Sequence, residues 1–178
     1  MEEPRVIEVS KLNPNFKYEV AKAPGGEGIL KCFACGTCTA SCPVRAINDK
    51  YNPRRIIHMV LLGMREEVLN SEFIWLCATC YACQERCPQG VRITDIMCAL
   101  QNIAAREGKV HNLYRNQLKA LADFGRLYEI DDYDNKKRRK KELPELISTG
   151  EEITKLIEKT HLSKYLSEMM SKDKKEEE

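Results

Sequence analysis

Eight of the nine cysteines fall into two runs that repeat one spacing, C-x2-C-x2-C-x3-C-P, with matched cysteines 45 residues apart. Three cysteines at positions i, i+3 and i+6 can wrap a short loop around a [4Fe–4S] cluster. The repeat therefore predicts two cluster-binding loops in one chain, and with them electron transfer. The runs are Cys32-Phe-Ala-Cys35-Gly-Thr-Cys38-Thr-Ala-Ser-Cys42-Pro43 and Cys77-Ala-Thr-Cys80-Tyr-Ala-Cys83-Gln-Glu-Arg-Cys87-Pro88.

The fourth cysteine of each run predicts crossed ligation. In proteins with two such runs, this cysteine binds the cluster that the other run surrounds. Because each cluster then joins segments that are distant in sequence, loss of the clusters should unfold much of the domain. We expect two [4Fe–4S] clusters, the first bound by Cys32, Cys35, Cys38 and Cys87 and the second by Cys77, Cys80, Cys83 and Cys42.

Other uses of the cysteines fit less well. Residues 1–17 are polar and carry Pro4 and Pro14, so they do not resemble a signal peptide. The longest apolar run, Ile56–Leu62 interrupted by His58, is too short to span a bilayer. We therefore expect a cytoplasmic chain without membrane segments, in which disulfides are rare. Structural zinc sites use two C-x2-C pairs and have no place for a third cysteine three residues on.

The remaining composition excludes several function classes. Lys and Arg total 29 against 27 Asp and Glu, so no overall positive field favours nucleic acid. No nucleotide-binding glycine loop, nucleophile elbow or His-Glu-x-x-His motif occurs, and we assign no catalytic residue. The basic run at 136–141 follows Asp131, Asp132 and Asp134, which favours a solvated linker or docking patch. The ninth cysteine, Cys98, is expected to pack as a small apolar side chain.

Residues around the runs bear on the cluster potential. Small residues such as Ala34 and Gly36 would let backbone amides approach the cluster sulfurs, and such hydrogen bonds help to set the reduction potential. Nearby cations could offset the negative charge of a thiolate-bound cluster; these are Lys31, Arg45, Arg86 and Arg92.

The insert between the runs predicts helices. Asn52 is a good N-cap, Pro53 suits the first helical position and Gly63 follows the last apolar residue. A short helix is expected over 65–69, with Ser71 as a possible cap for the turn that leads to the second run.

The flanking segments predict a different pattern on each side. Residues 1–27 form an N-terminal extension with short strands over 5–9 and 16–20. After the second run, Thr94 is expected to cap a helix that ends at Gly108. A further helix should carry Val110, Tyr114, Leu118 and Leu121 on one side.

The charged C-terminal part is predicted to be a linker followed by two short docking helices. A helical pattern covers residues 151–170 but changes face near 161–163, so we expect a break there and a disordered end. The predicted fold class is mainly α, a two-cluster domain with the clusters in loops between helices. Its parts are an extension (1–27), the cluster domain (28–125) and the charged linker with docking helices (126–178).

The two runs, separated by a helical insert and followed by helices, resemble the α-helical ferredoxin fold. That fold also occurs in iron–sulfur subunits of succinate dehydrogenase-like enzymes. A short chain with two such runs and a charged tail is similar to the small, C-type iron–sulfur subunit of heterodisulfide reductase from methanogenic archaea. Residues 32–43 and 75–83 carry this likeness, which covers about residues 28–125.

This resemblance implies partners. A flavin-containing subunit would deliver electrons, the C-type subunit would relay them, and a catalytic subunit with cysteine-rich CCG motifs would reduce the coenzyme M–coenzyme B heterodisulfide. A hydrogenase or formate dehydrogenase commonly feeds the complex. Because this chain has no Cys-Cys pair, the catalytic step is not expected on it. Three alternatives stay open: a relay subunit for glycolate, lactate or glycerol-3-phosphate oxidation, a free two-cluster ferredoxin, and a zinc-stapled interaction module.

Overall fold

The computed structural model describes residues 7–146, 151–160 and 162, and within them all regular structure is helical, with no β-strand. The predicted mainly α class is thus confirmed. The α-helices are α1 (Phe16–Lys22), α2 (Thr37–Ala40), α3 (Pro43–Ile47), α4 (Pro53–Leu61), α5 (Arg65–Leu69), α6 (Ala82–Glu85), α7 (Ile93–Arg106), α8 (Asn112–Phe124), α9 (Asp132–Arg139) and α10 (Glu151–Lys159). The described residues also form three short 3-10 helices: η1 (Val9–Lys11), η2 (Ile29–Lys31) and η3 (Glu72–Leu76).

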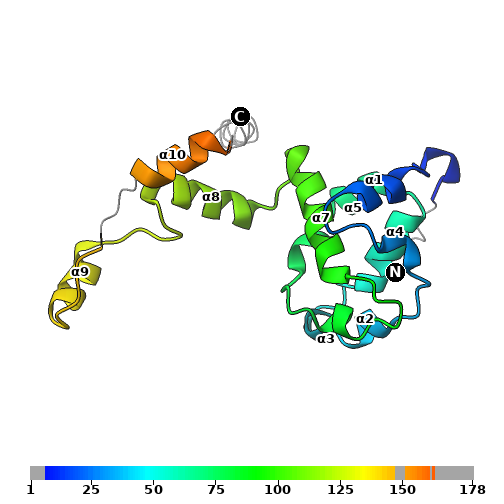
Figure 1. Ribbon diagram of the computed structural model, residues 1–178, viewed down its shortest axis with the longest axis horizontal. Coiled ribbons are helices and arrows are strands. Elements are labelled where there is room, and N and C mark those ends of the chain that lie inside the picture. Colours follow the sequence, from blue (N-terminus) through cyan, green and yellow to red (C-terminus); the bar gives the residue numbers. More distant parts are fainter. Residues whose placement is uncertain (1–6, 147–150, 161, 163–178) are drawn as a thin grey trace, which may run out of the picture. The chain divides into compact units, whose positions relative to one another are not determined.

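The chain forms two compact units, residues 1–109 and 110–178 (Figure 1). In this division α8 groups with the second unit, and the domain limit at residue 125 stays a prediction. The turn that separates the units follows α7, where Gly108 has a φ of +72° that favours glycine. The cysteine runs, the insert and α7 all belong to the first unit.

The insert helices form as predicted. The side chain of Asn52 accepts a hydrogen bond of 3.0 Å from the backbone N–H of Arg55, and Pro53 is the first residue of α4. The helix α5 has the predicted bounds. Ser71 precedes η3 without capping it, because its hydroxyl donates back to the carbonyl of Val68 at 2.7 Å.

The strand predicted over residues 16–20 is wrong, since these residues begin α1. Phe16 and Val20 are four positions apart and both fully buried, as expected for one face of a helix. Residues an even number of positions apart also lie on one face of a β-strand, so the same spacing is compatible with the strand that was predicted. The strand predicted over 5–9 does not form within the described residues 7–9, where η1 begins at Val9.

The core of the first unit is built around α7. This helix packs against α1, α5, α6 and η3, while α4 packs against α1, α2 and α5 (Figure 1). Their buried apolar residues include Ile56, Ile57, Val60, Ile96, Met97, Leu100 and Ala104. The cysteine runs are therefore anchored on this helical core.

The N-terminal segment is joined closely to the end of α4. The backbone N–H of Asn13 donates to the carbonyl of Gly63 at 2.8 Å. A Cβ atom at Gly63 would lie 2.3 Å from the carbonyl oxygen of Asn13, and the φ of Gly63 is +84°. Only glycine therefore fits at this crossing.

The second unit holds α8, α9 and α10, with α8 packed against α10. Within the predicted linker, residues 132–139 form the helix α9, which was not predicted from the sequence. Asp131 caps this helix by accepting the N–H of Asp134 at 2.8 Å. Acidic residues at its start and the basic residues 136–139 at its end both suit the helix dipole.

The helix predicted at 151–160 is confirmed as α10. The second docking helix and the predicted disordered end fall on 163–178, outside the described residues. Among the described helices, none has the length and apolar content needed to cross a membrane.

Candidate metal centre

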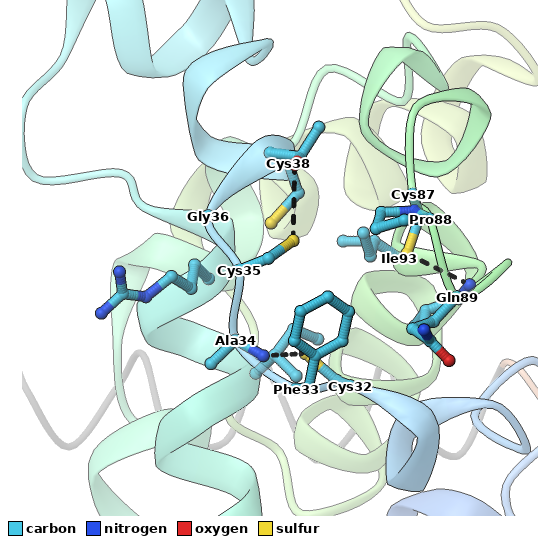
Figure 2. Close-up of a pocket in the computed structure, with 14 residues that line it drawn as sticks. Cys32, Phe33, Ala34, Cys35, Gly36, Cys38, Cys87, Pro88, Gln89 and Ile93 are labelled. Atoms are coloured by element: carbon cyan, nitrogen blue, oxygen red, sulfur yellow. Dashed lines mark hydrogen bonds between the residues drawn. The ribbon is translucent and has the colours of Figure 1, made fainter.

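Four cysteines from two distant segments line one pocket of the first unit. Cys32, Cys35 and Cys38 lie on one wall, and Cys87 lies on the facing wall beside Pro88 (Figure 2). Cys87 belongs to the second run, yet it faces the triplet of the first. The structure thus brings together the four thiols that the crossed pattern assigns to the first cluster.

The other four cysteines are placed around a buried tyrosine. Cys42, Cys77 and Cys83 are partly buried against the core that contains Tyr51. Burial raises the pKa of the Tyr51 phenol, and the same three cysteines raise it further. Cys80 is exposed. Three of the four thiols assigned to the second cluster are therefore gathered near one hydroxyl, and the fourth lies at the surface.

The two cysteine loops repeat their backbone conformation as well as their spacing. In the first run Ala34 (φ 59°) and Gly36 (φ 93°) are left-handed. Their counterparts in the second run, Thr79 (φ 48°) and Tyr81 (φ 63°), are left-handed too. Such residues turn backbone N–H groups toward one side and make concave anion sites of the kind that hold iron–sulfur clusters. For the β-branched Thr79 this conformation is unfavourable, so the surrounding fold must enforce it.

A one-turn helix follows each left-handed pair, α2 in the first run and α6 in the second. The third cysteine of each run, Cys38 or Cys83, lies inside that turn rather than in a loop. Such short helices are marginal alone and depend on packing. The two turns pack against each other, which brings the two runs together.

Backbone amides already contact two of the sulfurs. The N–H of Ala34 donates to Cys32 Sγ at 3.4 Å (Figure 2). The N–H of Val91 donates to Cys87 Sγ at 3.3 Å. The approach of small residues to the sulfurs, predicted from sequence, therefore occurs at Ala34. Hydrogen bonds of this kind are among the factors that set cluster potentials.

Two threonine hydroxyls contact cysteine sulfurs as well. Thr37 Oγ1 lies 3.4 Å from Cys35 Sγ, and this hydroxyl lowers the pKa of the exposed Cys35 thiol. Thr94 Oγ1 lies 3.5 Å from Cys83 Sγ. The prediction that Thr94 caps a helix is wrong: α7 starts at Ile93, and Thr94 is buried in its first turn. Its polar group contacts a thiol instead.

The sequence did not predict the cation beside the first set of cysteines, which comprises Cys32, Cys35, Cys38 and Cys87. Arg54 lines the pocket and helps to lower the pKa of Cys35. It lies far from the runs in sequence, and the capped start of α4 places it there. Of the cations predicted near the clusters, Arg92 forms an ion pair with Asp95 at 2.6 Å. Arg45 pairs with Asp49.

The donor set suits a cluster better than one ion. In the described part of the chain, no three Cys, His, Asp or Glu side chains converge as ligands to a single metal ion. A single zinc ion requires ligands about 2.0–2.3 Å from one point, whereas a [4Fe–4S] cluster takes four thiolates at separate irons. Thiolates are the soft ligands that such clusters use.

Comparison with known proteins extends these observations. The family model "4Fe-4S dicluster domain" matches residues 28–91. A C-type iron–sulfur subunit of CoB–CoM heterodisulfide reductase from Methanocaldococcus jannaschii is 36% identical, over 91% of this chain and 94% of its own. The corresponding iron–sulfur subunit from Methanopyrus kandleri is 34% identical, over 93% and 94%.

The chain belongs to the family of C-type iron–sulfur subunits of heterodisulfide reductases. The resemblance predicted from the cysteine runs is thereby confirmed. Another relative is the C-type subunit of the H2:CoB–CoM heterodisulfide, ferredoxin reductase from Methanothermobacter marburgensis, 33% identical over 89% of this chain and 88% of its own. As a member of this family, the chain is an iron–sulfur component of an oxidoreductase complex with a role in electron transfer.

Proposed function

We propose that this protein relays electrons through two [4Fe–4S] clusters with crossed ligands. Cys32, Cys35, Cys38 and Cys87 would hold the first cluster. Cys77, Cys80, Cys83 and Cys42 would hold the second. The single observation that best supports this assignment is the position of Cys87, which faces the first triplet across one pocket although it ends the second run.

The residues of the chain hold and tune the carriers. Each bound cluster supplies a site that accepts and releases one electron. The thiolates would hold the irons, and the amides of Ala34 and Val91, which contact Cys32 Sγ and Cys87 Sγ, would stabilise the negative sulfurs. The two sites would be neighbours, because Cys38 lies in α2 and Cys83 in α6, and these two helices pack against each other. Electrons would then pass between the two clusters within one chain.

The partners follow from the family. A flavin-containing heterodisulfide reductase subunit would deliver electrons, and a CCG-type catalytic subunit would reduce the coenzyme M–coenzyme B heterodisulfide. A hydrogenase or formate dehydrogenase would supply electrons to the flavin, and the complex would work in the cytoplasm during methanogenesis. This chain has no Cys-Cys pair and would act as a non-catalytic relay.

Reconstitution tests the relay. The anaerobically purified chain should contain about eight irons, as two [4Fe–4S] clusters require. Mixed with the flavin-containing and CCG-type subunits, it should restore electron flow from the reduced flavin to the heterodisulfide, while the chain without iron should not. A Cys98→Ser variant is the matched control, because it removes the one cysteine outside the runs. Full heterodisulfide reduction by the flavin-containing and CCG-type subunits alone would contradict the relay.

A further inference from the structure

Thr94 is a buried polar residue beside the second set of cysteines, which comprises Cys42, Cys77, Cys80 and Cys83. Its side chain is 1% exposed, and its hydroxyl lies 3.5 Å from Cys83 Sγ. A thiolate bound to iron has no proton, so in the loaded protein the hydroxyl must be the donor. At a buried position water does not compete with this donor, and the low local dielectric strengthens the hydrogen bond. The hydroxyl can therefore stabilise the negative charge on the Cys83 thiolate strongly.

Tyr51 supplies a second buried hydroxyl at the same set. The residue is 2% exposed, Cys77 packs against the same core cluster, and the Cys77 thiol lies close enough to the phenol to raise the phenol's pKa. Cys42 and Cys83 pack against the same core cluster. A phenol in this position is neutral and can donate to a thiolate. Tyr51 and Thr94 come from different elements, the loop before α4 and the first turn of α7, and both reach the second set.

The first set lacks this arrangement among the contacts described. Its thiols receive two backbone N–H groups and one hydroxyl, that of Thr37 at the exposed Cys35. Burial raises the pKa of the Cys38 thiol and the Thr39 hydroxyl lowers it in part, but the proton of this hydroxyl is donated to Asn52 Oδ1 at 2.8 Å. Water competes for an exposed sulfur, so a hydroxyl there contributes less. The two loops thus share a backbone conformation but differ in the side chains that surround them.

We infer that Thr94 and Tyr51 are positioning residues that raise the reduction potential of the second cluster by donating hydrogen bonds to Cys83 and Cys77. This inference rests on the proposed function, because it requires a cluster at the second set. On reduction one electron enters the cluster from a donor protein, no bond breaks and no proton moves. The added negative charge lies partly on the thiolates, so donors stabilise the reduced state more than the oxidised one.

Isosteric substitutions test the inference. Thr94→Val keeps the shape and removes the hydroxyl, Thr94→Ser keeps the hydroxyl, and Tyr51→Phe removes only the phenolic oxygen. Redox titration of the full chain with both clusters, followed by electron paramagnetic resonance, gives each potential. Thr94→Val and Tyr51→Phe should each lower one and the same potential by about 59 mV, a tenfold fall in the one-electron equilibrium constant. Thr94→Ser should stay close to the wild type.

Thr37→Val is the matched control. It removes a hydroxyl at nearly the same distance from a cysteine sulfur, but at the exposed Cys35. Its shift should be smaller and should affect the other cluster. If Thr94→Val fails to bind iron, Tyr51→Phe decides alone.

Unchanged potentials in fully loaded Thr94→Val and Tyr51→Phe would overturn the inference. So would equal shifts in Thr94→Val and Thr94→Ser, because the hydroxyl would then play no part. A wild-type chain without two reducible clusters would instead defeat the proposed function. The iron content and the number of reducible centres therefore separate the two failures.

Discussion

The guanidinium of Arg65 binds the carboxylate of Glu19 through two hydrogen bonds, Nε to Oε2 and Nη2 to Oε1, each 2.9 Å long. This bidentate pair joins α5 to α1. The same guanidinium lies 5.7 Å from the centre of the Phe16 ring and also binds Glu107. Arg65 therefore connects three segments of the first unit through the side chain of one residue.

Replacing Arg65 should destabilise the first unit. Arg65→Ala removes charge-assisted hydrogen bonds from a side chain that is 21% exposed, and we expect a loss of about 2 kcal/mol in the free energy of unfolding. Arg65→Lys should recover only part of it, because an ammonium cannot bind a carboxylate through a planar fork. Arg55→Ala, at an exposed position on α4, is the control. Equal denaturation midpoints for Arg65→Ala and Arg55→Ala would contradict this role.

Stability should fall at acid pH through Glu107. Arg65 chiefly, and Lys109 further, hold the pKa of Glu107 below its usual 4.5. A carboxyl whose pKa is lower in the folded state contributes stability that is complete above its unfolded pKa and is lost as the pH falls through the folded value. The difference in unfolding free energy between the wild type and Glu107→Gln should thus be largest above about pH 5 and shrink below about pH 4. A difference independent of pH would contradict this assignment.

Crossed ligation predicts which substitutions act together. Cys87→Ala should disturb the same cluster as Cys35→Ala, whereas Cys42→Ala should disturb the same cluster as Cys80→Ala. Iron content and the resonance signal that is lost identify the cluster in each variant. Uncrossed ligation would pair Cys87→Ala with Cys80→Ala instead, and that grouping would refute the assignment. Cys98→Ser should retain both signals.

Arg54 should raise the potential of the first cluster. Its positive charge lies beside Cys35 and favours the more negative, reduced state. Arg54→Gln should lower that potential, by less than a tenfold change in the equilibrium constant, because the side chain is exposed and salt screens its charge. Arg55→Gln, the adjacent exposed arginine, should have a smaller effect. The difference between the two variants should shrink at high ionic strength, and a shift that salt leaves unchanged would argue against an electrostatic cause.

Local signals in the sequence were sufficient to predict the first helix of the insert, α4. Asn52, Pro53 and Gly63 act on their own neighbours, so the start and end of α4 follow from residue types alone. The same reasoning failed for Thr94, whose hydroxyl found a tertiary partner in Cys83 rather than the helix end. Thr94 is the second residue of α7, two positions after the N-cap Arg92, and its residue type alone does not distinguish the two positions.

Tertiary neighbours could not be predicted in this way. Nothing in the sequence places Tyr51 or Arg54 beside a cysteine, since both depend on how the insert folds back over the runs. The left-handed conformation was signalled only at Gly36; Thr79 adopts it against its own preference, because its loop repeats the first one. The repeat of spacing was visible in the sequence, and the repeat of backbone conformation was not.

The crossing of Asn13 over Gly63 decides where a shortened version of this protein can begin. A fragment that starts at residue 28, as the matched family domain does, would lack α1 and leave the surfaces under Phe16 and Val20 open to water. It would also lose the hydrogen bond of 2.8 Å that the Asn13 N–H donates to the Gly63 carbonyl. A fragment made for crystallography or for fusion to another protein should therefore begin before Asn13, so that it keeps α1 and the contact between Asn13 and Gly63.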